Sequence, residues 1–446
     1  MTAVRSSARP QGMTAFLVIW IGQFISILAS GMSQFALTIW MYQETKSATA
    51  MGLMTAFYIT PFLLLSPIAG VLVDRYDRKL MMMLSDIVAG IATILILVFS
   101  ALGILEFWML YLVAILYGLG NTFQWPAYSA AITTMLPKEQ YGRANGLMSV
   151  LDAGPAVFAP FLAGALLPVI GLNGILLADV ITFLLAIGAL MVVFIPPPIQ
   201  THEGATAQGS MLKEAWFGFK YIFDRPSLLG LQLIFFFGNL FTVMAFTLLA
   251  PMILARTNQN SLIFGSVQTV AAVGGLVGGI LMSVWGGLKH RVHGVLLGWA
   301  ISGMSLIMLG SVQGIILWSA SLLFSGLISP LINTSNQTIW QSKVAPDLQG
   351  RVFSARRLIA WLPQPIAPIL AGLLADLVLE PAMQSNTLLA NRFGDHFGTG
   401  PGAGMSLMIV FCGACAALVG LSGYLFRPIR NAEEILPDHQ QNVGSA

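Results

Sequence analysis

Four carboxylic acids lie inside long apolar stretches of the sequence, where a charge is costly. They are Asp86, Asp152, Asp179 and Asp376. An acid at the centre of a bilayer costs about 2.5–3.5 kcal/mol on insertion scales, so a chain keeps one there for pairing or for function. A carboxyl group taken out of water also holds a proton more readily. The residues therefore indicate proton transfer, binding of a cation, or a hydrogen-bonded packing role.

The position of each acid along its apolar stretch distinguishes these roles. Asp152 lies about ten residues into its apolar stretch, near mid-depth at ~1.5 Å rise per residue, and Asp179 lies about a third of the way into the next stretch. We take Asp152 and Asp179 as candidates for a proton carrier or for the counter-ion of a cationic substrate. A hydrogen-bonded packing role is the alternative for Asp152. Asp86 and Asp376 lie near the ends of their stretches, which favours structural pairing.

The stretches that hold these acids must be membrane-spanning helices. The chain is 57% apolar and 9% charged, and its apolar runs recur from end to end. A helical span needs about 20 apolar residues, whereas strands of a barrel would show alternating segments of about 10. We therefore predict an all-α membrane protein of twelve transmembrane helices, in which 292–342 is divided by a turn at 311–314. The predicted spans are 14–43, 49–73, 80–102, 106–135, 142–170, 172–195, 226–255, 260–288, 292–311, 313–342, 350–379 and 402–426.

The basic residues predict the orientation. With both termini in the cytoplasm, 18 of the 21 Lys and Arg residues face it or lie at its boundary; Lys46, Arg256 and Arg392 are the exceptions. The positive-inside rule therefore predicts cytoplasmic termini in a multi-pass protein of the bacterial cytoplasmic (inner) membrane. The formal charge of +3 then reflects anchoring in the lipid bilayer, and we expect no nucleic-acid partner.

A polar stretch divides the spans into two sets of six. We predict an N-terminal six-helix bundle at 1–195, a cytoplasmic linker at 196–225, and a C-terminal six-helix bundle at 226–446. Within the linker, Met211–Phe223 mixes aromatic and charged residues in the manner of a helix on a membrane surface. The halves are repeats: a shift of 208 residues aligns Gly142-Arg143 with Gly350-Arg351, and Pro155 with Pro363.

The segment between spans two and three carries an ordered motif. Gly70-Val71-Leu72-Val73-Asp74-Arg75-Tyr76-Asp77-Arg78-Lys79 resembles the loop signature of the major facilitator superfamily, with Asp77 where that family usually has Gly. The resemblance implies the major facilitator fold of two six-helix pseudo-repeats. It also implies a cytoplasmic gate, in which the acid and the basic residues latch the two halves together. The gate residues that we expect are Gly70, Asp74, Arg75, Arg78, Lys79, Asp86, Arg143 and Arg351.

Within that superfamily the chain resembles the macrolide-efflux branch of bacterial drug:proton antiporters. The resemblance rests on Leu84-Ser85-Asp86, on Ala153-Gly154-Pro155 and on the Gly400–Met405 segment that opens the last span. Many such antiporters carry an Arg in span four, but 106–135 has no basic residue, so a proton route by that residue is not expected here.

In this superfamily spans one, four, seven and ten line a central cavity, and here all four carry uncharged polar residues at helical spacing. The alternative is that these side chains hydrogen-bond one helix to another. A cavity of amides and aromatics without basic residues suits neutral or cationic lipophilic molecules. The cavity candidates are Gln23, Ser26, Ser30, Gln34, Tyr117, Asn121, Gln124, Tyr128, Gln232, Asn239, Ser329, Asn333, Asn336 and Trp340.

These features favour export of lipophilic or amphiphilic, macrolide-like molecules by alternating access, coupled to protons. Uptake or facilitated diffusion of a small neutral solute is an alternative, as is a non-transporting membrane sensor or assembly factor. We expect a monomer that is not an enzyme, has no cofactor and has no metal site. Cys412-x-x-Cys415 lies within the last span, where small residues at this spacing pack a helix face.

Overall fold

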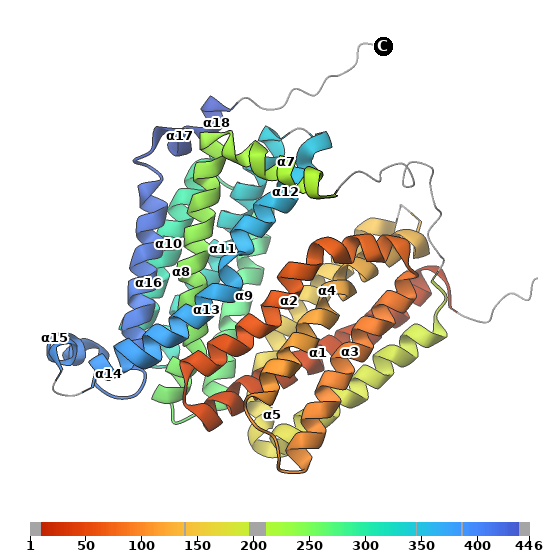
Figure 1. Cartoon of the computed structure of the whole chain (residues 1–446), viewed down its shortest axis with the longest axis horizontal. Coiled ribbons are helices and arrows are strands. Elements are labelled where there is room, and N and C mark those ends of the chain that lie inside the picture. Colours follow the sequence, from red (N-terminus) through yellow and green to blue (C-terminus); the bar gives the residue numbers. More distant parts are fainter. Residues whose placement is uncertain (1–9, 138–139, 196–210, 345, 385–386, 437–446) are drawn as a thin grey trace, which may run out of the picture. The chain divides into compact units, whose positions relative to one another are not determined.

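The computed structural model describes residues 10–137, 140–195, 211–344, 346–384 and 387–436, and the elements in these ranges are helices (Figure 1). The side chains of some residues within these helices, several of the motif residues among them, are outside the description. The first half of the chain contains α1 (Gly12–Thr45), α2 (Ala48–Arg75), α3 (Arg78–Ala101), α4 (Met109–Met135) and α5 (Tyr141–Val192).

The helix α5 contains two of the predicted spans. Gly171 divides it with φ 66° and ψ 178°, which are non-helical angles. A left-handed φ is accessible to glycine at no steric cost, so the chain can bend there between two apolar segments. The bend falls at the predicted boundary between 142–170 and 172–195.

The second half begins with α7 (Met211–Phe223), which has the bounds predicted for the amphipathic segment. The turn predicted at 311–314 is also confirmed, because α10 ends at Ser311 and Gly314 has φ 99° ahead of α11. The further helices are α8 (Pro226–Arg256), α9 (Ser261–Trp285), α10 (Arg291–Ser311), α11 (Ile315–Lys343), α15 (Leu388–Phe397), α16 (Ala403–Ser422), α17 (Arg427–Arg430) and α18 (Ala432–Ile435).

The predicted span 350–379 is a run of consecutive helical segments, of which Ala355–Ala382 is long and apolar enough to cross a membrane. It comprises α12 (Pro346–Trp361), α13 (Pro363–Leu374), the π-helix η2 (Ala375–Leu379) and α14 (Glu380–Ala382). Pro363 begins α13 and has no backbone N–H to continue the helix from α12. The π-turns then widen the helix at its far end.

The all-α membrane fold is confirmed. Among the described residues, ten helices are long and apolar enough to cross a membrane, and Met109–Gln124 adds a shorter apolar helix. One of the ten, Ala153–Val192, contains the bend at Gly171 and so provides two spans.

The helices form two compact units. The first contains 1–46, 53–200 and 260–269, and the second contains 47–52, 201–259 and 270–446. The predicted boundaries at 195 and 226 stay a prediction. The units also assign two short segments to the other half of the chain, 47–52 to the second unit and 260–269 to the first.

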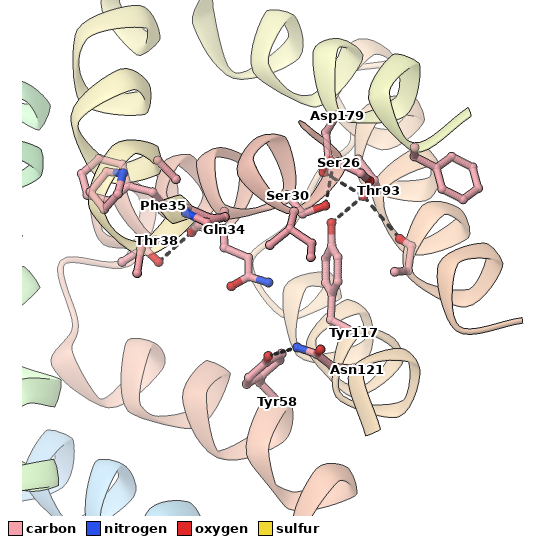
Figure 2. Close-up of a pocket in the computed structure, with 18 of the residues that line it drawn as sticks. Ser26, Ser30, Gln34, Phe35, Thr38, Tyr58, Thr93, Tyr117, Asn121 and Asp179 are labelled. Atoms are coloured by element: carbon pink, nitrogen blue, oxygen red, sulfur yellow. Dashed lines mark hydrogen bonds between the residues drawn. The ribbon is translucent and has the colours of Figure 1, made fainter. Parts of the chain in front are cut away.

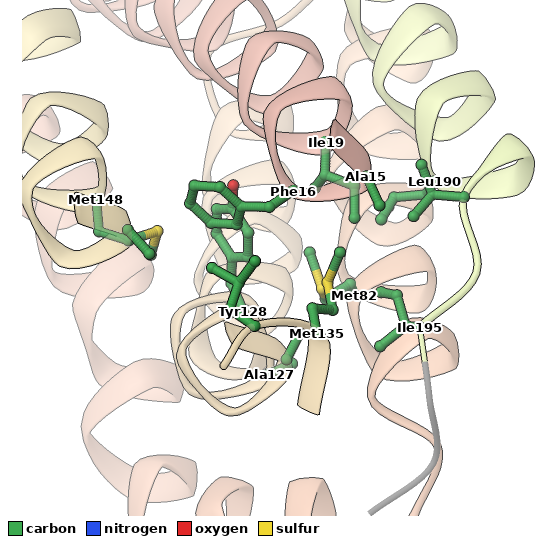
Figure 3. Packing of buried hydrophobic residues seen from close by; sticks show 14 of the residues in the cluster. Ala15, Phe16, Ile19, Met82, Ala127, Tyr128, Met135, Met148, Leu190 and Ile195 are labelled. Carbon is green, nitrogen blue, oxygen red and sulfur yellow. The ribbon is translucent and has the colours of Figure 1, made fainter. Parts of the chain in front are cut away.

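Each unit has its own apolar core. In the first, Phe16 and Ile19 of α1 pack with Met82 of α3 and Tyr128 of α4 (Figure 3). In the second, the fully buried Trp340 of α11 packs with apolar residues of α7 and α12. Close helix packing depends on glycine: a Cβ on Gly278 of α9 would lie 2.6 Å from the Leu327 carbonyl oxygen of α11.

Candidate functional site: two polar cavities

The first unit contains a cavity of about 570 Å³. Figure 2 shows side chains from α1, α2, α3, α4 and α5 around it. The helix α1 contributes Ser26, Ser30 and Gln34, whose spacing of four residues places them on one face. The predicted cavity face of α1 therefore lines a cavity.

Asp179 of α5 lies in the wall of this cavity and is 1% exposed. The hydroxyl of Ser30 donates to one carboxylate oxygen at 2.8 Å, and the hydroxyl of Thr93 lies 3.2 Å from the other (Figure 2). The Tyr117 hydroxyl in turn bonds to that of Thr93. Since Thr93 has a single hydroxyl hydrogen, donation to Asp179 requires it to accept from Tyr117. The hydroxyl groups of α1 and α3 thus bond to this acid directly, and the Tyr117 hydroxyl of α4 bonds to one of them.

Asp86 of α3 is the second acid in the wall and is 6% exposed. Its two oxygens accept from Gln23 Nε2 at 2.8 Å and from Gln124 Nε2 at 2.6 Å. The amide of Gln124 also donates to Gln23 Oε1 at 2.7 Å. The sequence grouped Asp86 with the cytoplasmic gate, whereas the structure places it with amides of spans one and four.

The cavity has an unbalanced set of charges. Its described lining includes Asp86 and Asp179 but no Lys or Arg. Among the described residues, both carboxylates accept hydrogen bonds from neutral amides and hydroxyls. An acid buried without a cation favours a bound proton or a positively charged ligand. Such a wall can bind a cation, or exchange a cation for protons.

The second unit contains a smaller cavity of about 300 Å³. Asn239 of α8 and both Ser329 and Asn333 of α11 line it, as predicted for spans seven and ten. The amide of Asn239 donates to the Ala360 carbonyl oxygen at 3.0 Å. The aromatic rings of Trp299 and Phe246 complete a mixed polar and apolar lining.

Five of the predicted cavity residues line neither cavity: Gln23, which bonds to Asp86 behind the wall, and Tyr128, Gln232, Asn336 and Trp340. Tyr128 is 2% exposed in the core of the first unit. Gln232 donates to the Arg356 carbonyl oxygen at 3.0 Å, and the indole of Trp340 donates to Asn336 Oδ1 at 3.0 Å. They lie on the predicted helical faces, at levels where neighbouring helices close over them. The contacts of Tyr128, Gln232, Asn336 and Trp340 therefore favour the packing alternative.

The motif between spans two and three is described only in part. Asp77 is the N-cap of α3 and accepts from the Leu80 backbone N–H at 3.0 Å, which gives this departure from the family pattern a structural use. The Lys79 ammonium donates to the carbonyl oxygens of Met191 and Val193 near the end of α5. The side chain of Arg78 is half-buried. Gly70, Asp74, Arg75, Arg143 and Arg351 lie outside the residues whose side chains the structure describes, and so does Asp152.

Asp376 has the structural pairing that the sequence favoured. Its carboxylate accepts from the Ser47 hydroxyl at 2.6 Å and from the backbone N–H groups of Ala48 and Thr49 at 3.1 and 2.8 Å. It therefore caps the N-terminus of α2 from η2. Glu380 accepts from the Met405 backbone N–H at 2.9 Å at the start of α16.

Sequence reasoning missed several polar side chains of the cavity walls, among them Tyr58, Thr93 and Arg356. Tyr58 of α2 accepts from the Asn121 amide, and Thr93 of α3 connects Tyr117 with Asp179 (Figure 2). Arg356 of α12 lines a groove beside α11. Its position inside the predicted span 350–379 was a visible signal in the sequence.

A bundle of apolar helices with polar side chains gathered around internal cavities is the architecture of a membrane transporter. The chain belongs to the Major Facilitator Superfamily, whose family model matches residues 19–368.

Relatives and solved structures agree with this assignment. The chain is 27% identical over 366 residues to macrolide efflux protein A of Streptococcus pyogenes, an alignment that covers 81% of this chain and 89% of the relative. It is 24% identical to the enterobactin exporter of Citrobacter koseri, over 76% of this chain and 80% of that protein. A bacterial homologue of the human lysosomal transporter Spinster has the same fold, with a TM-score of 0.65 at 16% identity, covering 92% of this chain and 96% of the other.

Proposed function

We propose that the protein exports lipophilic or amphiphilic small molecules by alternating access, and that proton entry drives this export. The observation that carries the proposal is the cavity of the first unit, with two buried acids and no basic residue in its described lining. A carboxylate held only by hydroxyl groups or amides has no fixed positive charge to compete with a proton or a cationic substrate.

Asp179 is the acid best suited to carry the proton. Its partners Ser30 and Thr93 can either donate or accept, because a hydroxyl group can do both. They can therefore stay bonded whether Asp179 is charged or protonated. Asp86 is held instead by Gln23 and Gln124. Asp152 remains a second candidate proton carrier, because the sequence predicts that it lies near the middle of the membrane.

Relatives support the direction of transport. Two similar proteins have names that describe efflux of macrolides and export of enterobactin. Both names refer to molecules that leave the cell, and export of a large organic molecule is the property that we transfer to this chain.

The energetics permit coupling by protons. One charge that crosses a potential of 100 mV provides about 2.3 kcal/mol. Since ~1.4 kcal/mol corresponds to a tenfold ratio, one proton per cycle supports an accumulation of roughly fortyfold. In this proposal the protein resides in the bacterial inner membrane with both termini in the cytoplasm, as its basic residues predict.

Drug accumulation in cells tests the function. Cells that express the wild type should retain less of a fluorescent lipophilic cation or a macrolide than cells with an empty vector, and a protonophore should abolish the difference. A matched strain should express Asp179→Asn at equal membrane abundance. Equal accumulation in wild-type and empty-vector cells across a panel of macrolides, lipophilic cations and neutral amphiphiles would exclude drug export.

A further inference from the structure

A second polar surface lies along α11 in the second unit. Every fourth residue of this helix is polar at Ser325, Ser329, Asn333, Gln337 and Gln341. Such spacing forms one stripe along the helix. Beside the stripe lies a groove of about 410 Å³, lined by Asn333, Thr334, Gln337, Thr338, Gln341 and Arg356.

The polar stripe is buried at Ser325 but is accessible further along α11. Asn333, Thr334 and Gln341 are exposed, although α11 meets the length and apolarity of a membrane span. Polar side chains that face hydrocarbon are costly, so in spans they face a protein interior or a water-filled space. The groove is therefore a place for water or for a polar part of a ligand.

Arg356 is the charged member of this groove, and its position is fixed. One N–H of its guanidinium donates to Gln337 Oε1 at 2.9 Å. The guanidinium carbon lies 5.2 Å from the ring centroid of Trp340 and 5.7 Å from that of Phe353. No carboxylate forms an ion pair with it within the described part of the chain. A guanidinium has five N–H donors, and the Gln337 bond uses one of them.

We propose that this groove is a subsite for the carboxylate end of an amphiphilic substrate, with Arg356 as its anchor. The proposal rests on the proposed function and makes the substrate class narrower. A guanidinium binds a carboxylate through two parallel hydrogen bonds, and Arg356 is already oriented by Gln337 and Trp340.

The subsite also changes the class of substrate that the sequence predicted. The absence of basic residues on spans one, four, seven and ten favoured neutral or cationic molecules. Arg356 comes from span eleven, so that reasoning did not count it. The first cavity contains acids and this groove contains a cation, and each therefore selects a different chemical group.

A matched pair of fluorescent amphiphiles tests the subsite. We would measure binding of 11-(dansylamino)undecanoic acid and of its methyl ester to the full chain in nanodiscs of neutral lipid, with empty nanodiscs subtracted. The wild type should prefer the acid by about tenfold or more, since charge-assisted bidentate pairs are roughly twice as strong as neutral hydrogen bonds. Arg356→Gln should remove this preference by weakening acid binding alone, and Arg356→Lys should retain part of it.

Two further variants separate binding from folding. Arg357→Gln is the matched control, because the neighbouring Arg357 is exposed against Trp361 and does not line the groove. Gln341→Glu adds a negative charge to the groove, leaves Arg356 in place, and should weaken acid binding without affecting the ester. These two variants keep the test valid if Arg356→Gln fails to fold.

Equal affinity of the wild type for acid and ester would overturn the proposal. An equal loss of acid binding in Arg357→Gln would overturn it as well, because general surface charge would then explain the preference. Failure of the proposed function would give a different result. If the protein prefers the acid through Arg356 but transports neither compound, the subsite is supported and export of these two amphiphiles is excluded.

Discussion

Asp376→Ala removes the hydrogen-bond acceptor that caps the N-terminus of α2. The lost contacts are those with the Ser47 hydroxyl and with the backbone N–H groups of Ala48 and Thr49, at 2.6, 3.1 and 2.8 Å. Ala48 is 0% exposed, so water cannot readily replace the carboxylate at its N–H. The variant therefore leaves at least one buried donor without an acceptor.

The cost follows from these contacts. Loss of a helix N-cap costs about 0.5–2 kcal/mol of the free energy of unfolding. A buried donor left without an acceptor costs roughly 1–3 kcal/mol. We expect a total near 2–4 kcal/mol. At ~2 °C per kcal/mol, the low end of the range for large domains, the melting temperature should fall by about 4–8 °C.

A thiol-reactive dye can report this unfolding. In a background without the partly exposed Cys415, the fully buried Cys412 of α16 reacts with the dye when the helices separate. Asp376→Asn keeps one acceptor oxygen and should lose less stability than Asp376→Ala. Asp395→Ala is the control, because Asp395 is exposed in α15, and it should change stability by less than about 0.5 kcal/mol. A melting temperature of Asp376→Ala within 1 °C of the control would refute the capping role.

Three further predictions concern packing, the gate and topology. Gly278→Ala should destabilise the protein by about 1–3 kcal/mol, because its new methyl group meets Leu327. Gly279→Ala is the control, because the space around Gly279 is open, and it should not destabilise the protein. Equal melting temperatures of the two variants would contradict this prediction. Asp74→Asn should lower the transport rate at unchanged expression, because it removes a charge from the proposed gate, and unchanged kinetics would show ordinary anchoring. In a background without Cys412 and Cys415, His202→Cys should be labelled from the cytoplasm and Asp395→Cys from outside; labelling of both from one side would exclude the topology.

Much of the fold was predictable because a membrane leaves few choices. Long apolar runs can only be helices in lipid, and glycine marks the bends, as Gly171 and Gly314 show. The helix Met211–Phe223 followed from the alternation of its aromatic and charged residues. The subdivision of span eleven at Pro363 was harder to predict, because Pro155, Pro160 and Pro168 lie inside α5 while Pro363 begins a new helical segment.

The sequence predicted the helix face on which a site residue lies, but not its level along the helix. Helical spacing placed Ser30, Gln34, Tyr117 and Gln124 on cavity faces, and the structure agrees. The same spacing selected Trp340, which is buried where α7 and α12 cover its end of α11. Spacing identifies a side of a helix, but only tertiary packing decides where along that side the space opens.

The partners of the acids needed the tertiary structure. Asp86 meets Gln23, which lies 63 residues away in the chain, and Asp179 meets Ser30 at a separation of 149 residues. Nothing in the local sequence of either acid indicates these partners. The Asp86 carboxylate therefore belongs with amides of spans one and four, although its motif neighbours suggested the gate.

Flux through purified protein with and without an ionisable Asp179 tests the central claim most directly. Proteoliposomes with an imposed pH gradient should show uphill export of a lipophilic substrate by the wild type. Asp179→Asn imitates the permanently protonated acid, so it should lose pH-driven export while it still exchanges substrate across the membrane without a gradient. The same assay on Asp152→Asn decides whether the second candidate shares the role. Full pH-driven export by both asparagine variants would contradict the account.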